Sequence, residues 1–224
     1  MIEIIPTVVP VSFDEIEKAA ERAAPFASAL HIDLADGTFA PNATWLPQAE
    51  HLTPRLPAQA DGAFIYEAHL MVALPREVGL KAIAVGARRV IGHIEAMGKN
   101  VESIFAAWRA AGAAEVGLGI LFNTPLEDLD PYIGMCDVVQ MMTISEIGVQ
   151  GLPFNPEAPA RVAALHARHP GLLIEVDGGV GEKTIEALAR AGARRFCAGS
   201  ALSRASDPAS TYQKLIALAE AGVQ

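Results

Sequence analysis

Hydrophobic and polar positions follow two alternating patterns along the chain. Short apolar or β-branched runs give way to longer runs in which apolar residues recur with helical spacing. The short runs predict eight strands, over residues 3–9, 28–34, 63–71, 88–94, 115–121, 137–142, 172–176 and 194–198. The longer runs predict helices over residues 13–24, 75–85, 101–111, 156–169, 182–191 and 207–221. Residues 47–57 fit neither pattern well, so we predict only an irregular helix there.

Strand-and-helix repeats with no linker between them predict an α/β fold, a single (β/α)8 TIM barrel that forms one domain over residues 1–224. The alternative is an open, doubly wound sheet of the Rossmann type. That fold would place a GxGxxG turn after the first strand, where this chain has Val9-Pro10-Val11-Ser12. In a barrel, chemistry takes place at the carboxyl ends of the strands, so the residues there are the functional candidates.

The amino-acid composition of the chain limits the kinds of molecule that it is expected to bind. Hydrophobic residues make up 51% of the 224 positions and charged residues 19%, which is enough apolar material for one sizeable core. The chain has 17 Lys and Arg against 26 Asp and Glu, and its net charge of −9 repels a phosphate backbone. We therefore predict no nucleic-acid partner, and an anionic small molecule would need a local binding site.

The cysteines and the first residues of the sequence are the features from which we predict the cellular compartment of the protein. Cys136 and Cys197 are far apart in the sequence, so we predict two reduced core residues and neither a disulfide nor a structural zinc site. The opening residues, MIEIIPTVVP, lack the basic region of a signal peptide, and no apolar run reaches the roughly 18 residues of a membrane span. We expect a cytoplasmic protein with no membrane partner.

Charged and imidazole side chains gather at the predicted strand ends. Residues 30–37, LHIDLADG, place His31 and Asp33 on the same side of an extended strand, because they are two residues apart. His69 lies near the end of the third predicted strand and Asp177 directly after the seventh, and no Lys or Arg stands at these ends. One divalent metal ion, either Zn, Fe, Mn or Co, would compensate the carboxylates if these four residues held it. His93 and Glu95, at the end of the fourth strand, are candidates for partners that orient His69.

Glycines cluster in the last three loops. The candidates for binding a phosphate group through backbone N–H groups are Gly148 and Gly151, Gly178 and Gly179, and Gly199 beside Ser200. Barrels frequently bind phosphate after strands seven and eight. The structural alternative is that these glycines end strands for steric reasons alone.

Four motifs occur in a fixed order between the second strand and the last helix. They are HIDLADG followed by Pro41-Asn42, then EAHLMVALP, IEVDGGV and CAGSAL. These motifs resemble the HIDxMDG and FxPN, xxHLMVxxP, VDGG and AGSA motifs of the ribulose-phosphate 3-epimerase family. The combination in this order is specific and covers nearly the whole chain.

The resemblance implies an isomerase of the pentose phosphate pathway that inverts C3 of D-ribulose 5-phosphate to give D-xylulose 5-phosphate. It implies that His31, Asp33, His69 and Asp177 bind the metal, that the two aspartates also move the protons, and that the chain forms a homo-oligomer. The chemistry agrees, because strands two and seven lie on nearly opposite sides of an eight-stranded ring. Their carboxylates could flank a flat enediolate, one removing a proton and the other returning one.

Three positions depart from the family pattern. Pro10 stands where the family has a serine that contacts substrate, and Ala35 stands where it has a methionine. The loop NPGFGGQ is replaced by SEIGVQG, whose Glu146 would repel a phosphate dianion. These changes affect how the substrate is held and leave the metal and proton machinery in place.

Other functions remain open on the sequence. Related barrel decarboxylases need the lysine of a DxKxxD motif, and Ala35 replaces it here. The same machinery could epimerise another ketose phosphate, such as a 2-ketohexose 6-phosphate. A barrel that binds metal and sugar phosphate without turnover is favoured by Pro10 and Glu146 and disfavoured by the two intact aspartates, which could also be purely structural ligands.

Overall fold

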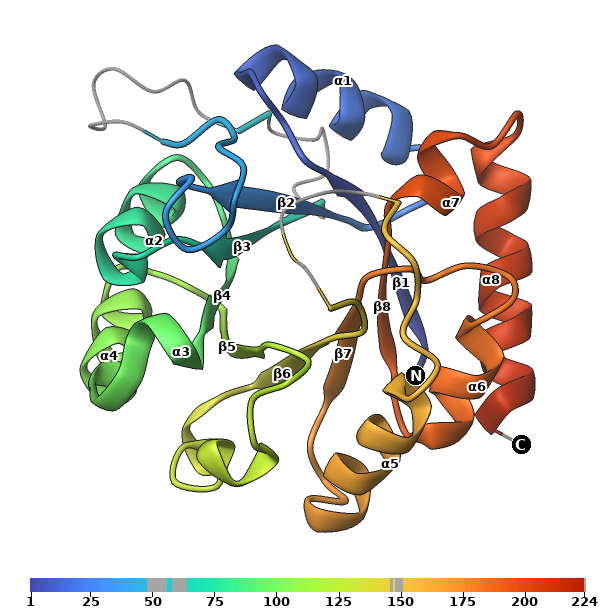
Figure 1. The fold of residues 1–224 in the computed structure, drawn as a ribbon. Coiled ribbons are helices and arrows are strands. Elements are labelled where there is room, and N and C mark those ends of the chain that lie inside the picture. Colours follow the sequence, from blue (N-terminus) through green and yellow to red (C-terminus); the bar gives the residue numbers. More distant parts are fainter. Residues whose placement is uncertain (48–55, 58–63, 146, 148–150, 224) are drawn as a thin grey trace.

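The computed structural model describes residues 1–47, 56–57, 64–145, 147 and 151–223. Its strands are β1 (Glu3–Val8), β2 (Ala29–Ala35), β3 (Ile65–Met71), β4 (Arg89–His93), β5 (Glu115–Ile120), β6 (Val138–Met142), β7 (Ile174–Asp177) and β8 (Arg195–Ala198). Each strand pairs in parallel with the next, and β8 pairs with β1 to close the barrel (Figure 1). The predicted (β/α)8 barrel is confirmed, and the open sheet is excluded.

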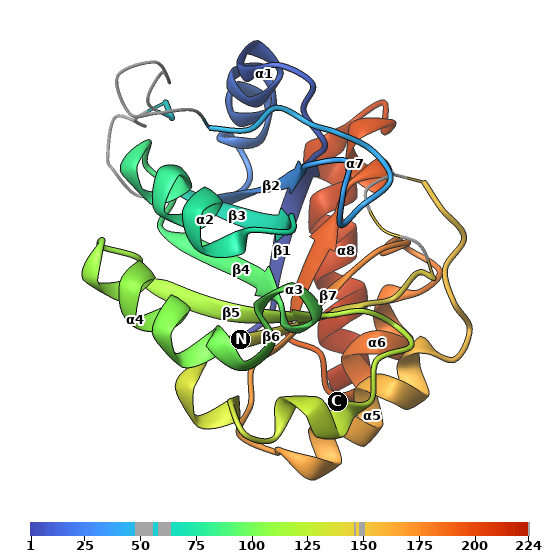
Figure 2. The same ribbon diagram turned by 60° about the vertical axis from the view of Figure 1, so that its left-hand side comes forward.

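The helices form the outer layer around the strands (Figure 2). They are α1 (Phe13–Ala23), α2 (Pro75–Ala84), α3 (Ile94–Met97), α4 (Val101–Ala110), α5 (Ala158–Arg168), α6 (Ile185–Ala191), α7 (Ser200–Ser203) and α8 (Pro208–Val223), with 3-10 turns η2 (Gly98–Asn100), η3 (Leu126–Leu129) and η4 (Ile133–Met135). The predicted helices are confirmed with ends that differ by a few residues. Periodicity could not predict the short turns, because they lack a full amphipathic repeat. The segment 47–57 lies largely outside the described residues.

The strands and the helices differ in which of their residues are buried, as expected for strands inside a ring of helices. All seven residues of β2 are buried, as expected for a parallel strand covered on both faces. Helix α1 instead buries Ile16, Ala19, Ala20 and Ala23, which form one stripe toward the strands. Among the helices of the described residues, none is both long enough and apolar enough to cross a membrane.

Helices α2 and α4 pack so closely that one glycine is required. The fully buried indole of Trp108 on α4 lies against Gly79 of α2, where a Cβ would come within 2.4 Å of the ring. We expect Gly79→Ala to lower the free energy of unfolding by about 1–2 kcal/mol, because the overlap outweighs the roughly 1 kcal/mol gained in helix propensity. Urea unfolding measures the change. The matched control is Gly171→Ala, since a Cβ at Gly171 would have no neighbour within 4 Å. Equal stability of the two variants would contradict this account.

The amino-terminal end of the barrel is closed by ion pairs. Arg195 of β8 contacts Glu3 at 2.8 Å and Glu115 at 3.0 Å, and its Nη1 lies 3.5 Å from both Glu67 and Glu175. Burial, followed by the charge of Glu67, raises the pKa of Glu175 to about 8. This end of the barrel is filled by protein charges, so the opening for a small molecule lies at the other end.

Candidate active site

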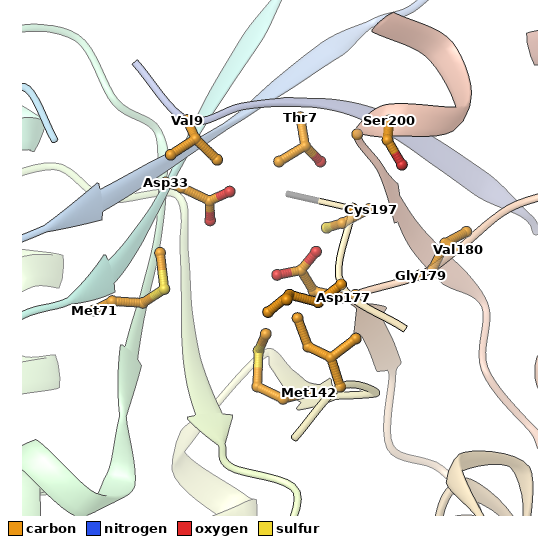
Figure 3. A pocket seen from close by; sticks show the side chains of 15 residues that line it. Thr7, Val9, Asp33, Met71, Met142, Asp177, Gly179, Val180, Cys197 and Ser200 are labelled. Atoms are coloured by element: carbon orange, nitrogen blue, oxygen red, sulfur yellow. The ribbon is translucent and has the colours of Figure 1, made fainter. Parts of the chain in front are cut away.

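A pocket opens at the carboxyl ends of the strands. Side chains from β1, β2, β3, β6, β7 and β8 line it, together with the loops that follow β6, β7 and β8. Figure 3 shows the carboxylates of Asp33 and Asp177 facing each other across the pocket, with Met71 and Met142 below them. The two aspartates come from β2 and the end of β7, on nearly opposite sides of the ring.

The four predicted metal ligands converge at the base of this pocket. Asp33 Oδ1 lies 2.8 Å from His69 Nδ1 and 3.3 Å from His31 Nε2, and Asp177 Oδ2 lies 3.8 Å from His69 Nδ1. One donor atom from each of the four lies within 4.8 Å of the others. Both imidazoles are fully buried. Two imidazole nitrogens and two carboxylate oxygens form a donor set that suits a divalent transition metal.

The two carboxyl groups differ in their electrostatic surroundings. Burial by itself raises the pKa of Asp33, but hydrogen bonds and charge from His31 and His69 outweigh it and hold that pKa well below its ordinary value. Burial, followed by the charge of Asp33, raises the pKa of Asp177 to about 7. Among the described residues, no Lys or Arg forms an ion pair with either carboxylate. A divalent cation would therefore supply the charge that the surrounding protein does not.

A second group of donors lies beneath the first. His31 Nδ1 is 2.7 Å from Glu67 Oε1 and 3.3 Å from Cys197 Sγ, and Cys197 also contacts Glu175 at 3.3 Å. Arg195 already lies beside both glutamates, so their charge is compensated. The upper group is therefore the metal candidate, and Glu67 serves it by turning Nε2 of His31 toward the pocket.

The predicted phosphate-binding residues lie along one wall of the pocket. Gly151, Gly178, Gly179, Gly199 and Ser200 all line it, whereas Gly148 falls outside the described residues. Gly178 has φ of 108°, and a Cβ there would lie 2.6 Å from Ile144. Gly179 has φ of 66°, and a Cβ there would lie 2.9 Å from Phe154. Only glycine satisfies both the backbone angle and the space at these two positions.

Several site residues were not singled out from the sequence. Arg204 follows α7, and its guanidinium packs on the pocket-lining Gly151, where a Cβ would lie 3.1 Å from Nη2. Thr7 and Met71 line the pocket, and so does Cys197, which was predicted only as a core residue. The sequence signal for Met71 and Cys197 was their place in or beside the HLM and AGSA motifs, whereas Arg204 had no such signal.

The departures from the family pattern have local explanations. Pro10 is buried, and its carbonyl accepts a hydrogen bond of 2.7 Å from the Trp45 N–H. This part of the chain contributes Thr7 of β1 and Val9, which follows β1, to the pocket lining. Ala35 packs in a small buried cluster with Met71 and Met142. Glu146 lies outside the described residues.

The second carboxylate of LHIDLADG has a structural role. Asp36 Oδ1 accepts hydrogen bonds from the Thr38 and Phe39 N–H groups, and its Oδ2 accepts one of 2.7 Å from the Ala73 N–H. Partial burial by itself raises the pKa of Asp36, but these hydrogen bonds outweigh it and hold that pKa below its ordinary value. Asp36 therefore ties the loop after β2 to the loop after β3 and does not enter the pocket.

Comparison with known proteins points to one family. The profile described as "Ribulose-phosphate 3 epimerase family" matches residues 3–203. A ribulose-phosphate 3-epimerase, cytoplasmic isoform, of Oryza sativa subsp. japonica is 32% identical over 218 residues, covering 95% of this chain and 92% of the relative. The ribulose-phosphate 3-epimerase of Schizosaccharomyces pombe is 34% identical over 212 residues, covering 92% of this chain and 89% of the relative.

Solved structures share the fold at low sequence identity. KGPDC from Streptococcus mutans has a TM-score of 0.70 at 13% identity, covering 98% of this chain and 98% of the other. The 3-hexulose-6-phosphate synthase from Salmonella typhimurium has a TM-score of 0.71 at 13% identity, covering 97% and 98%. At this identity the likeness concerns the barrel alone.

Proposed function

Because the chain belongs to the ribulose-phosphate 3-epimerase family and is a metal-dependent epimerase of the isomerase class, we propose that it interconverts D-ribulose 5-phosphate and D-xylulose 5-phosphate. The observation that carries the proposal is the pair of carboxylates, Asp33 and Asp177, that face each other across one pocket. Inversion at C3 requires a proton to leave one face of the carbon and another to arrive at the opposite face. Two aspartates on opposite walls meet that requirement.

The proton transfers follow from this arrangement. The C3 proton is acidic because C3 adjoins the C2 ketone. One aspartate takes that proton and leaves a planar enediolate, and the conjugate acid of the other aspartate delivers a proton to the opposite face. One C–H bond breaks and one forms, so the pair ends with its protonation states exchanged. In the reverse direction Asp33 and Asp177 exchange roles.

A divalent metal ion completes the proposed site. His31, Asp33, His69 and Asp177 would hold it, and the donor set fits Zn, Fe, Mn or Co. When bound, the ion supplies positive charge that stabilises the negative oxygens of the enediolate. Met71 and Met142 line the same pocket and would present apolar surface to the carbon chain of a bound sugar.

The glycine-lined wall is the proposed phosphate site. Backbone N–H groups near Gly178, Gly179 and Gly199, with the hydroxyl of Ser200, would donate hydrogen bonds to a phosphate dianion. The exposed guanidinium of Arg204 beside Gly151 would add a positive charge at the rim. This cation matters because the chain as a whole carries a net charge of −9.

A substrate panel tests the proposal. We expect turnover of D-ribulose 5-phosphate and much weaker activity on free D-ribulose, because the free sugar lacks the charge-assisted contacts of the phosphate. Coupled assays with pentulose and hexulose phosphates measure the preference. Turnover of a hexulose phosphate alone would instead favour the second epimerase function. Binding without turnover across a metal-supplemented panel would favour a non-catalytic barrel, and equal activity on free sugars would refute the phosphate site.

The Arg204 contribution can be measured separately. We expect Arg204→Gln to raise KM for D-ribulose 5-phosphate about 10-fold with little change in kcat, the effect of losing one charge-assisted hydrogen bond. Arg190→Gln is the matched control, since Arg190 is exposed on α6 and pairs only with Glu186 among the described residues. A KM equal to that of the control would remove Arg204 from the site.

The remaining parts of the proposal concern the setting of the enzyme. We propose a cytoplasmic homo-oligomer that acts on a small sugar phosphate and has no nucleic-acid or membrane partner. The acidic net charge of the chain and the absence of a membrane-spanning helix among the described residues support the last point. Val11 and Leu74 are exposed apolar residues in loops after β1 and β3 and are candidates for a subunit contact. Light scattering measures the oligomeric state.

A further inference from the structure

We propose that His93 and Glu95 form a directional relay with His69, and that with a metal ion bound this relay places the His69 proton on Nε2 and leaves Nδ1 to the metal. The inference rests on the proposed metal site and assigns positioning roles to two residues outside the group of four ligands. It concerns the fourth strand and its loop.

The first link joins two strands. His69 of β3 points Nδ1 toward Asp33, and its Nε2 lies 2.8 Å from Nε2 of His93 at the end of β4. The His93 ring is fully buried. It is held on one side by the ring of Phe39, at a centroid distance of 5.1 Å, and on the other by Gly119, where a Cβ would lie only 3.2 Å away. The ring therefore has little freedom to turn away from His69.

The second link ends on a carboxylate. Nδ1 of His93 lies 3.3 Å from Oε2 of Glu95, at ion-pair distance, and neither of these two buried atoms has a hydrogen-bond partner among the described residues. The other oxygen of Glu95 accepts a hydrogen bond of 2.9 Å from the Leu121 N–H and one from the Thr124 hydroxyl. Both donors belong to the loop after β5. Glu95 is thus fixed at one oxygen and directs the other at His93.

The tautomers follow from donor and acceptor counting. An ionised carboxylate only accepts, so His93 must carry its proton on Nδ1 and leave Nε2 as an acceptor. When a metal ion occupies the site, His69 donates from Nε2 and its Nδ1 lone pair faces the ion, whereas without the ion Nδ1 is the group that hydrogen-bonds Asp33 at 2.8 Å. The carboxylate of Glu95 therefore favours the tautomers that leave Nδ1 of His69 available to the metal. Partners of this kind fix the ring and the basicity of a metal-binding histidine.

The series of contacts that begins at His69 continues to an outer helix. Arg161 of α5 donates hydrogen bonds to the carbonyls of Leu121 and Thr124, the two residues that hold Glu95. The loop that fixes the carboxylate is therefore itself tied to the outer layer. This anchoring explains how a partly exposed loop can keep the half-buried carboxylate of Glu95 in one orientation.

Glu95→Gln offers a sharp test because it changes the direction of the relay without changing its shape. If the side-chain oxygen keeps its bonds to Leu121 and Thr124, the new NH₂ faces His93 Nδ1. His93 must then donate from Nε2, and His69 must carry its proton on Nδ1, which blocks metal binding there. If the amide flips instead, its NH₂ faces the Leu121 N–H and the anchor is lost.

We expect Glu95→Gln to weaken Co²⁺ binding about 10- to 100-fold, measured by competition with a chelator, and to alter the visible absorption of the Co²⁺-loaded protein. His93→Phe should have a similar effect. His93→Gln should restore much of the affinity, because an amide can accept from His69 and donate to Glu95. Glu77→Gln, at an exposed position on α2, is the matched control. Circular dichroism and thermal unfolding check that each variant is folded.

The outcomes separate the relay from the proposed function. Wild-type affinity and an unchanged Co²⁺ spectrum in folded Glu95→Gln and His93→Phe would overturn the relay and leave the metal site standing. Equal losses in His93→Phe and His93→Gln would also overturn it, because the second variant preserves the direction of the hydrogen bonds. A wild-type chain that binds no metal would overturn the proposed metal site, and the relay with it.

Discussion

Asp33→Asn and Asp177→Asn are each expected to lower kcat on D-ribulose 5-phosphate by about 10²- to 10⁴-fold, the usual contribution of one proton-transfer group. The amide keeps the size and much of the polarity of the carboxyl group, but it cannot accept and return a proton. Coupled assays measure kcat. The matched control is Asp128→Asn, because Asp128 is exposed and lies outside the pocket.

Solvent deuterium separates the two aspartates. During turnover in deuterated water, the wild-type enzyme should place deuterium at C3 of the product. Each single variant should exchange the C3 proton only in the epimer whose proton faces the remaining aspartate, with little net epimerisation. Proton NMR of the C3 position measures this exchange. Wild-type turnover without any solvent deuterium at C3 would refute the two-aspartate transfer.

Metal removal is the second change with a large expected effect. Protein purified without chelator should hold about one divalent metal ion per chain, since one group of four converging donors faces the pocket. Dialysis against a chelator should lower kcat by several orders of magnitude, because a Lewis acid of this kind stabilises charge in the transition state by several kcal/mol. Adding back Zn²⁺, Fe²⁺, Mn²⁺ or Co²⁺ in turn should restore activity and identify the best metal.

His69→Ala should lose most of the bound metal and most of the activity together. His69 lies closest to both carboxylates, so its removal leaves them without the imidazole that joins them. His169→Ala is the matched control, because His169 is at the end of α5 and contacts Asp130 instead. Elemental analysis measures the metal. A metal-free chain with full activity would refute the site.

The strands and the four candidate metal ligands follow from the sequence alone. Parallel barrel strands are buried on both faces and read as apolar runs, so all eight were found from the chain alone. His31, Asp33, His69 and Asp177 were found because a barrel brings the carboxyl ends of its strands together, whatever separates them in the sequence. Position at a strand end, together with the resemblance of the surrounding motifs to one family, selected them as candidates.

The contacts around these candidate ligands depend on how the strands and loops are packed. The pairing of β2 with β3 sets His31 opposite Glu67 and Asp33 opposite His69, and a shift of one residue would turn these side chains to the other face. The contact of Arg204 with Gly151 likewise depends on how two loops approach each other. Such contacts depend on register and loop packing, which are set by the whole closed ring and not by any local stretch of sequence.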